Sequence, residues 1–270
     1  RARPHRCGSM TAAPDSPEPG PRDRRSLPLV ALIPNLVTLM GLCAGLTAIR
    51  YALADRWEIA AALIVLAAVI DGMDGLLARK LNAASSFGAE LDSLSDFVCF
   101  GVAPGLVIYR FALSDLPGFG WLMVLVFILC CCLRLARFNV NRDAPPPPGR
   151  AHFVGVPAPA GAMLGLMPLF AGLASGWDVP GLPWLVAPWM GFVGLLMISR
   201  LPTLSPKGIR IARRHAPGVF VGVAVLAGLL VMRPWAVLVA LGLIYLGLLA
   251  QAAWVHRRRL ARAARGAESA

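Results

Sequence analysis

The sequence predicts an all-α integral membrane protein: a polytopic bundle of about eight transmembrane helices with both termini in the cytoplasm. Of its 270 residues, 57% are hydrophobic and only 15% are charged, whereas soluble domains carry about 25% charged residues. The apolar residues gather in segments of about 20 residues, the length that crosses a bilayer. Most of the basic residues lie between these segments, near their ends or in the two tails.

The apolar segments can be placed one after another along the chain. We expect eight of them, at roughly residues 30–52, 58–79, 87–111, 119–138, 157–176, 181–199, 216–232 and 235–255. The last two are separated only by Arg233-Pro234, which predicts a tight turn. Connections rich in basic residues alternate with connections that are poor in them. The positive-inside rule therefore places both tails in the cytoplasm.

Charge and cysteine content exclude several classes of function. The net charge is +12, but the basic residues follow short loops between apolar segments instead of forming a patch on a polar domain. This pattern favours an anionic membrane surface as partner and argues against nucleic-acid binding. Five of the six cysteines lie inside apolar segments without metal-binding spacing. We interpret them as packing residues, so neither disulfides nor zinc are expected.

Acidic residues concentrate where the second apolar segment ends and the third begins. An ionised carboxylate inside a membrane helix costs on the order of 3 kcal/mol or more, so such residues are functional by default. Asp71 and Asp74 are spaced i, i+3, and Asp92 and Asp96 are spaced i, i+4, so each pair shares one helix face. Because a short cytoplasmic connection makes the two helices antiparallel, we expect all four carboxylates to converge just inside the cytoplasmic surface.

Four converging carboxylates repel one another unless cations neutralise them. Hard divalent ions prefer oxygen ligands, and Mg²⁺ or Mn²⁺ also brings phosphate chemistry. Paired metals clamp a phosphoryl centre, so the sequence predicts two Mg²⁺ or Mn²⁺ ions. The alternative is a set of structural ion pairs between the aspartates and neighbouring basic residues, which are Arg79, Lys80, Arg134 and Arg137.

The acidic residues belong to a longer pattern, D-x2-D-G-x2-A-R-x8-G-x3-D-x3-D, which begins at Asp71 and ends at Asp96. It resembles the signature of the CDP-alcohol phosphotransferase family at all eight fixed positions. The resemblance implies a dinuclear metal site on Asp71, Asp74, Asp92 and Asp96. It also implies that Asp96 is the base that acts on the acceptor hydroxyl. The cleft for the CDP-lipid would be lined by Gly75, Ala78, Arg79 and Gly88.

Segments outside the signature resemble the phosphatidylserine synthase branch of this family: 33–38, 91–104, 133–139 and 153–159. This resemblance implies transfer of a phosphatidyl group from CDP-diacylglycerol to L-serine with release of CMP. Asn35 and Thr38 would help to bind the CDP-lipid, although a polar pair in a first helix can instead hydrogen-bond to its neighbours. Acceptor binding is assigned to four residues, Arg134, Arg137, Asn139 and Lys207.

These four assignments have plainer alternatives. Arg134 and Arg137 can bind a carboxylate or pyrophosphate as planar forks, but an arginine there also serves as an interfacial anchor. Lys207 is almost as well explained as a solvated loop residue. The acceptor also stays open at this point, since choline, glycerol 3-phosphate and inositol phosphate are used within the same family. A cation transporter that binds ions at the aspartates is the alternative from a different class.

Four regions are expected along the chain. They are a disordered basic tail at 1–26, a catalytic membrane domain at 27–215, two additional transmembrane helices at 216–256 and a basic tail at 257–270. The family resemblance further implies a homodimer. We expect a multi-pass protein of the bacterial inner membrane, surrounded by membrane lipids, with its active site facing the cytoplasm.

Overall fold

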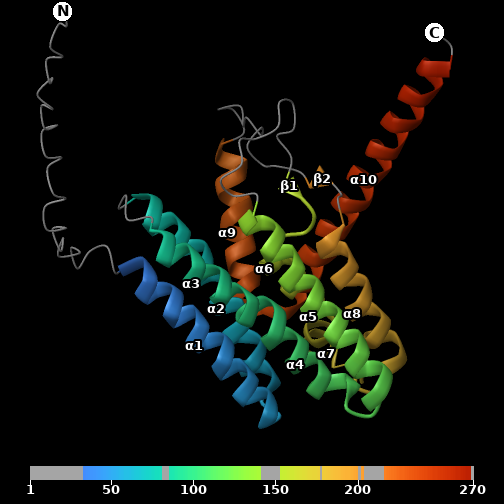
Figure 1. Cartoon of the computed structure of the whole chain (residues 1–270). Coiled ribbons are helices and arrows are strands. Elements are labelled where there is room, and N and C mark those ends of the chain that lie inside the picture. Colours follow the sequence, from blue (N-terminus) through green and yellow to red (C-terminus); the bar gives the residue numbers. More distant parts are fainter. Residues whose placement is uncertain are drawn as a thin grey trace, which may run out of the picture.

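A bundle of long helices dominates the computed structural model of the chain (Figure 1). The structure describes residues 33–80, 85–140, 153–176, 178–199, 202–203 and 216–268, and for some residues within these ranges only the backbone. Helices are expected because apolar segments in a bilayer must satisfy their backbone hydrogen bonds internally. The two termini of the described chain lie on α1 and α10.

The first half of the chain forms four long helical segments, each close to a predicted position. They are α1 (Ile33–Leu53), α2 (Trp57–Lys80), the segment that begins with α3 (Ser86–Asp96), and α5 (Pro117–Val140). The third segment is not one regular helix. After α3 it continues through a π-helical stretch η2 (Phe97–Val102), α4 (Ala103–Ile108) and a second π-helical stretch η3 (Tyr109–Leu113). Such π-helical stretches are frequent at functional sites.

The second half of the chain is more broken. It contains α6 (Ala158–Gly165), α7 (Met167–Ser175), α8 (Pro183–Ile198), α9 (Ala216–Met232) and α10 (Pro234–Glu268). The axes of α6 and α7 are bent by 45° relative to each other, where Pro168 follows the break. A short antiparallel pair, β1 (Phe153–Val154) with β2 (Pro202–Thr203), adds two strands to the predicted all-α fold.

Helices therefore lie at each predicted position, but they differ in their capacity to cross a membrane. Within the described residues, five helical segments are long and apolar enough for a span. The number of possible spans rises to six if the bent pair α6–α7 crosses the membrane as one span. The helix α8 is apolar but shorter. The chain is thus a multi-pass helical protein with about five to six apolar segments of spanning length.

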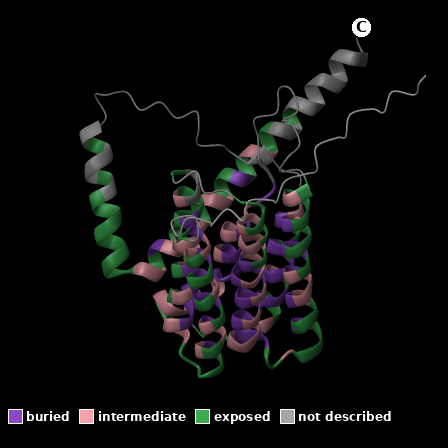
Figure 2. Ribbon diagram, turned by 60° about the vertical axis from the view of Figure 1, so that its left-hand side comes forward, coloured by how far each residue is buried: buried purple, intermediate pink, exposed green. Residues whose placement is uncertain are grey.

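Small residues allow the helices of the N-terminal half to pack closely. The buried residues of α1 include Gly41, Ala44, Gly45, Ala48 and Ala52; a Cβ on Gly41 would meet Ile70 of α2, and one on Gly45 would meet Cys99 of η2. Membrane bundles favour such small residues at helix contacts because they let backbones approach. Figure 2 shows the buried residues gathered inside the bundle and the exposed ones on its outer faces.

Large apolar side chains remain exposed on the outside of the bundle. On α9 the exposed residues include Val225, Leu229, Val231 and Met232, and Figure 2 shows α9 standing apart from the main bundle. A contiguous apolar surface of this kind suits lipid chains and is unusual on a soluble monomer. The exposure pattern therefore agrees with a protein that is surrounded by lipid.

Candidate functional site

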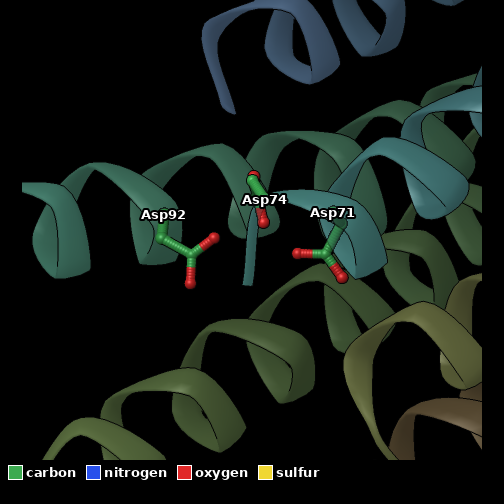
Figure 3. Close-up of side chains that lie close together, drawn as sticks. All are labelled: Asp71, Asp74 and Asp92. Carbon is green, nitrogen blue, oxygen red and sulfur yellow. The ribbon is translucent and has the colours of Figure 1, made fainter. Parts of the chain in front are cut away.

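Three aspartates from two helices meet in one place (Figure 3). Asp71 and Asp74 come from the C-terminal half of α2, and Asp92 comes from α3. Each offers a carboxylate oxygen, and these oxygens all lie within 4.8 Å of one another. Asp74 is buried, while Asp71 and Asp92 are half-buried. The i, i+3 spacing on α2 and the antiparallel run of α3 thus bring together three of the four carboxylates that the sequence predicts to converge.

Asp96 lies beside this group without being part of it. It lines the same small pocket as Asp71, Asp74 and Asp92, and its carboxyl group hydrogen-bonds to that of Asp71. Two carboxyl groups share such a contact only with a proton or a cation between them, since two bare carboxylates repel. The four acids therefore form an arrangement of three close oxygens and a neighbouring fourth carboxyl.

The donor set fits a hard divalent cation. All three close ligand atoms are carboxylate oxygens, which Mg²⁺ and Mn²⁺ prefer over softer donors. A carboxylate cluster in a low-dielectric setting is destabilised by mutual repulsion unless positive charge is present. The acidic cluster is therefore compatible with divalent-metal binding through Asp71, Asp74 and Asp92.

Polar contacts from α1 hold this cluster in place. The buried Thr38 hydroxyl donates to Asp74 Oδ2 at 2.8 Å. On α3, the Ser95 hydroxyl donates to the carbonyl oxygen of Thr38 at 3.4 Å. The Cys99 thiol donates to the carbonyl oxygen of Gly41 at 3.4 Å. These contacts join α1, α2 and the third helical segment around the acids, so the site is built on rigid elements.

The pocket combines the acids with an apolar wall. Besides the four aspartates it is lined by Thr38, Gly41, Ala67, Ile70, Ser95, Cys99 and Phe100. On the third helical segment, the lining positions 92, 95, 96, 99 and 100 repeat with helical spacing. One face of that segment therefore carries both Asp92 and Asp96 and part of the pocket wall.

The residues predicted to bind the CDP-lipid have different surroundings. A Cβ added to Gly75 meets no atom within 4 Å, so this glycine borders open space. A Cβ added to Gly88 would lie 2.7 Å from Asn35 Oδ1 and 3.1 Å from Ser85 Oγ. Gly88 therefore lets α1 and α3 approach closely beside the acids. Two further predicted side chains, those of Ala78 and Arg79, lie outside the described residues.

The predicted acceptor-binding residues make structural contacts at the same end of the bundle. Ser93 on α3 donates its hydroxyl hydrogen to Asn139 Oδ1 on α5 at 3.0 Å. Arg137 Nη1 donates to the carbonyl oxygen of Ile198, at the end of α8, at 3.1 Å. Both contacts bring the C-terminal end of α5 close to α3 and α8. Lys207 lies outside the described residues.

Arg134 has a different environment from Arg137. It is half-buried on α5, and its Nε atom is buried without a hydrogen-bond partner. Its charge interacts electrostatically with the Asp96 carboxyl group. Arg134 thus lies near enough to the acidic site for its charge to act on Asp96.

Sequence reasoning missed several residues around the site. Ser93 and Ser95 occupy variable positions of the signature; the i, i+3 spacing of Ser95 from Asp92 is the available signal for Ser95, whereas nothing in the local pattern indicates the contact of Ser93 with Asn139. Cys99 was interpreted only as a packing residue, yet its thiol bonds to the neighbouring helix. No local pattern indicated Tyr245, whose hydroxyl is buried without a partner on α10.

Comparison with known proteins gives a consistent result. Residues 31–198 match the family model described as CDP-alcohol phosphatidyltransferase, and residues 217–249 match one described as CDP-alcohol phosphatidyltransferase 2. The chain is 40% identical over 228 residues to the CDP-diacylglycerol–serine O-phosphatidyltransferase of Mycobacterium tuberculosis. The aligned region covers 82% of this chain and 78% of the relative.

Two further relatives bear the same name. The Mycobacterium leprae protein is 40% identical over 230 residues, covering 84% of this chain and 75% of the relative. The Bacillus subtilis protein is 40% identical over 131 residues, covering 48% of this chain and 71% of the relative. The first family model spans more than half of the chain and includes all four aspartates of the site. The chain therefore belongs to the CDP-alcohol phosphatidyltransferase family.

Proposed function

We propose that this chain is a phosphatidylserine synthase, which transfers the phosphatidyl group of CDP-diacylglycerol to the hydroxyl of L-serine and releases CMP. The observation that carries this proposal is the cluster of three carboxylate oxygens within 4.8 Å of one another, with Asp96 beside it. The printed names of the relatives, at 40% identity over most of the chain, support serine as the acceptor. Choline, glycerol 3-phosphate, inositol phosphate and cation transport are not favoured by these relatives.

The site residues divide the chemistry between them. Asp71, Asp74 and Asp92, with Asp96 beside them, would hold two divalent cations, which when bound supply positive charge to the pyrophosphate and to the leaving phosphate. The Asp96 carboxylate accepts the proton of the serine hydroxyl. The hydroxyl oxygen then forms a bond to the phosphorus that carries diacylglycerol. The bond from that phosphorus to the CMP oxygen breaks, and CMP leaves with the electron pair.

Binding of the two substrates is proposed for residues around the acids. The CDP-lipid is assigned to Gly75, Ala78, Arg79, Gly88, Asn35 and Thr38, and the acceptor to Arg134, Arg137, Asn139 and Lys207. The open space beside Gly75 supports the first assignment. The position of Arg134 near Asp96 supports the second. Because Thr38 already donates to Asp74, we assign it an orienting role as well.

The arrangement in the membrane is proposed from the positions of the apolar segments and of the basic residues between them. We propose eight transmembrane helices with both termini cytoplasmic, in a bacterial inner membrane, with the acids facing the cytoplasm and two Mg²⁺ or Mn²⁺ ions in the site. The catalytic domain would span residues 27–215 and the additional helices residues 216–256, between the tails at 1–26 and 257–270. The two family matches, 31–198 and 217–249, support the middle boundary. A homodimer remains a prediction for light scattering in detergent.

The test is serine-dependent release of CMP by the purified full-length protein in detergent. It receives CDP-diacylglycerol, Mg²⁺ or Mn²⁺, and one of the four acceptors at a time: L-serine, choline, glycerol 3-phosphate or inositol phosphate. Release with serine, lost in Asp96→Asn, is the expected result. Release with another acceptor but not with serine would overturn the acceptor assignment. A protein that releases no CMP with any acceptor would contradict the enzyme assignment.

A further inference from the structure

In the described part of the chain, one buried polar atom on α5 and one on α10 have no hydrogen-bond partner. Within the described part of the chain, Arg134 Nε and the Tyr245 hydroxyl oxygen are the buried side-chain nitrogen and oxygen atoms that have no hydrogen-bond partner. More than nine in ten buried polar groups in proteins are hydrogen-bonded, and each exception needs an explanation. The presence of two exceptions in one neighbourhood points to a ligand that binds both.

The two residues lie next to the acidic site and to each other. The charge of Arg134 interacts electrostatically with the Asp96 carboxyl group and with the Tyr245 hydroxyl. Arg134 comes from the cytoplasmic end of α5, which the Ser93–Asn139 contact holds beside α3. Arg134 is therefore near the carboxyl group that would take the proton of the acceptor, and Tyr245 is near Arg134.

The face of α10 that carries Tyr245 is fixed against the bundle. The Trp235 ring stacks on Phe170 of α7 with centroids 5.8 Å apart, and a Cβ on Gly242 would lie 2.7 Å from Met167 Sδ. Positions 235, 242 and 245 follow helical spacing, so they share one face. Tyr245 is consequently turned toward the protein core and away from the surrounding lipid.

The chemistry of the pair selects an anion. The Nε–H of arginine only donates, and a tyrosine hydroxyl can donate its hydrogen to the same acceptor. A cation is disfavoured beside a guanidinium group, whereas the oxygens of a carboxylate or phosphate accept both hydrogen bonds. The donor pyrophosphate is expected at Asp71, Asp74 and Asp92, on the metal side. The acceptor must lie at Asp96, and an amino-acid acceptor brings its own carboxylate.

We propose that Tyr245, from the C-terminal helix, forms with Arg134 a two-donor subsite for the carboxylate of the acceptor amino acid. This inference rests on the proposed function and deepens it. It gives α10 a direct part in choosing the acceptor, although α10 lies outside the segment that carries the aspartate signature. Serine would then be held at its carboxylate by Arg134 and Tyr245 and at its hydroxyl by Asp96.

The experiment compares Tyr245→Phe with the wild-type full-length protein, in detergent with CDP-diacylglycerol and Mn²⁺. We expect the KM for L-serine to rise by about 10-fold or more, since a hydrogen bond to a charged group is lost. The kcat at saturating serine and the KM for CDP-diacylglycerol should stay close to wild type. The thermal unfolding temperature without substrate should not fall, because phenylalanine removes a buried unpaired hydroxyl.

Two controls separate this subsite from a purely structural role. Tyr109→Phe removes the hydroxyl of a tyrosine whose ring packs on Trp121 with centroids 5.2 Å apart, and its kinetics should match wild type. L-Serine methyl ester lacks the carboxylate, so wild type and Tyr245→Phe should use this poor acceptor equally well. A lower unfolding temperature with an unchanged serine KM would reveal a structural tyrosine and overturn the proposal.

The remaining outcomes are also decisive. A rise in the KM for CDP-diacylglycerol instead of serine would assign the pair to a phosphate of the donor and overturn the carboxylate subsite. An unchanged KM for both substrates would overturn the subsite. Failure of the subsite is distinguishable from failure of the function, because in the first case the wild type still releases CMP with serine. A wild type inactive with serine would remove both proposals.

Discussion

Replacing Thr38 by valine removes one hydrogen bond to the acidic cluster and leaves the shape of the side chain nearly unchanged. The Thr38 hydroxyl lies 2.8 Å from Asp74 Oδ2, and both residues are buried. A hydrogen bond to a charged acceptor contributes about 1.5–3 kcal/mol. Loss of an outer contact to a metal ligand weakens metal affinity by about 10–100-fold, which corresponds to a similar free energy. We therefore expect the Kd for Mn²⁺ to rise by that factor.

Binding of Mn²⁺ to the purified protein, measured by electron paramagnetic resonance without substrate, tests this expectation directly. Thr38→Ser keeps the hydroxyl and should restore most of the affinity. Thr47→Val is the matched control, because the Thr47 hydroxyl donates to the carbonyl oxygen of Cys43 in its own helix at 2.6 Å. An unchanged Kd in Thr38→Val, with the protein still folded, would refute the argument that α1 orients the ligands.

Three further predictions concern the site and its packing. Asp96→Asn should lower serine-dependent CMP release by about 10²–10⁴-fold while Mn²⁺ binding persists, and a large loss of Mn²⁺ binding would make Asp96 mainly a ligand. EDTA should abolish CMP release, and Mg²⁺ or Mn²⁺ should restore it; activity that survives chelation would contradict the metal site. Gly45→Ala should lower the unfolding temperature, because its Cβ would lie 2.7 Å from Cys99 Sγ and 3.2 Å from Cys99 Cα, and overpacking costs about 1–3 kcal/mol. Gly75→Ala meets no atom within 4 Å, so it should leave that temperature unchanged and raise the KM for CDP-diacylglycerol; the reverse pattern would remove Gly75 from the cleft.

Features set by local periodicity could be predicted from the sequence. Apolar segment length gave helices at the eight expected positions, since a chain in lipid has few other ways to pair its backbone. The spacing of Asp71 and Asp74 on one helix and Asp92 on the next gave the convergence of the acids. The irregular third segment was not foreseen, because a π-helical stretch such as Phe97–Val102 has no simple periodic signature.

Features set by contacts between distant helices could not be predicted in the same way. Whether Arg137 faces a substrate or the carbonyl oxygen of Ile198 depends on where α8 ends. Asn139 similarly accepts a hydrogen bond from Ser93, across 46 residues of sequence. Tyr245 becomes a candidate binding residue only because its buried hydroxyl has no partner and α10 places it near Arg134. Such pairings depend on tertiary packing, which periodicity along one helix does not encode.

The four aspartates are not equivalent in position, since three are grouped and Asp96 lies beside them. This difference would let one site both hold cations and accept a proton. A carboxylate whose oxygens coordinate a cation is a weaker base. A site with four equivalent metal ligands would therefore lack a proton acceptor. Here three oxygens lie within 4.8 Å of one another, and the Asp96 carboxyl group lies beside them, in hydrogen-bond contact with that of Asp71. The Asp96 carboxyl also interacts electrostatically with Arg134 of α5. The acceptor hydroxyl would therefore meet its base at the boundary between the metal cluster and the basic residues of α5.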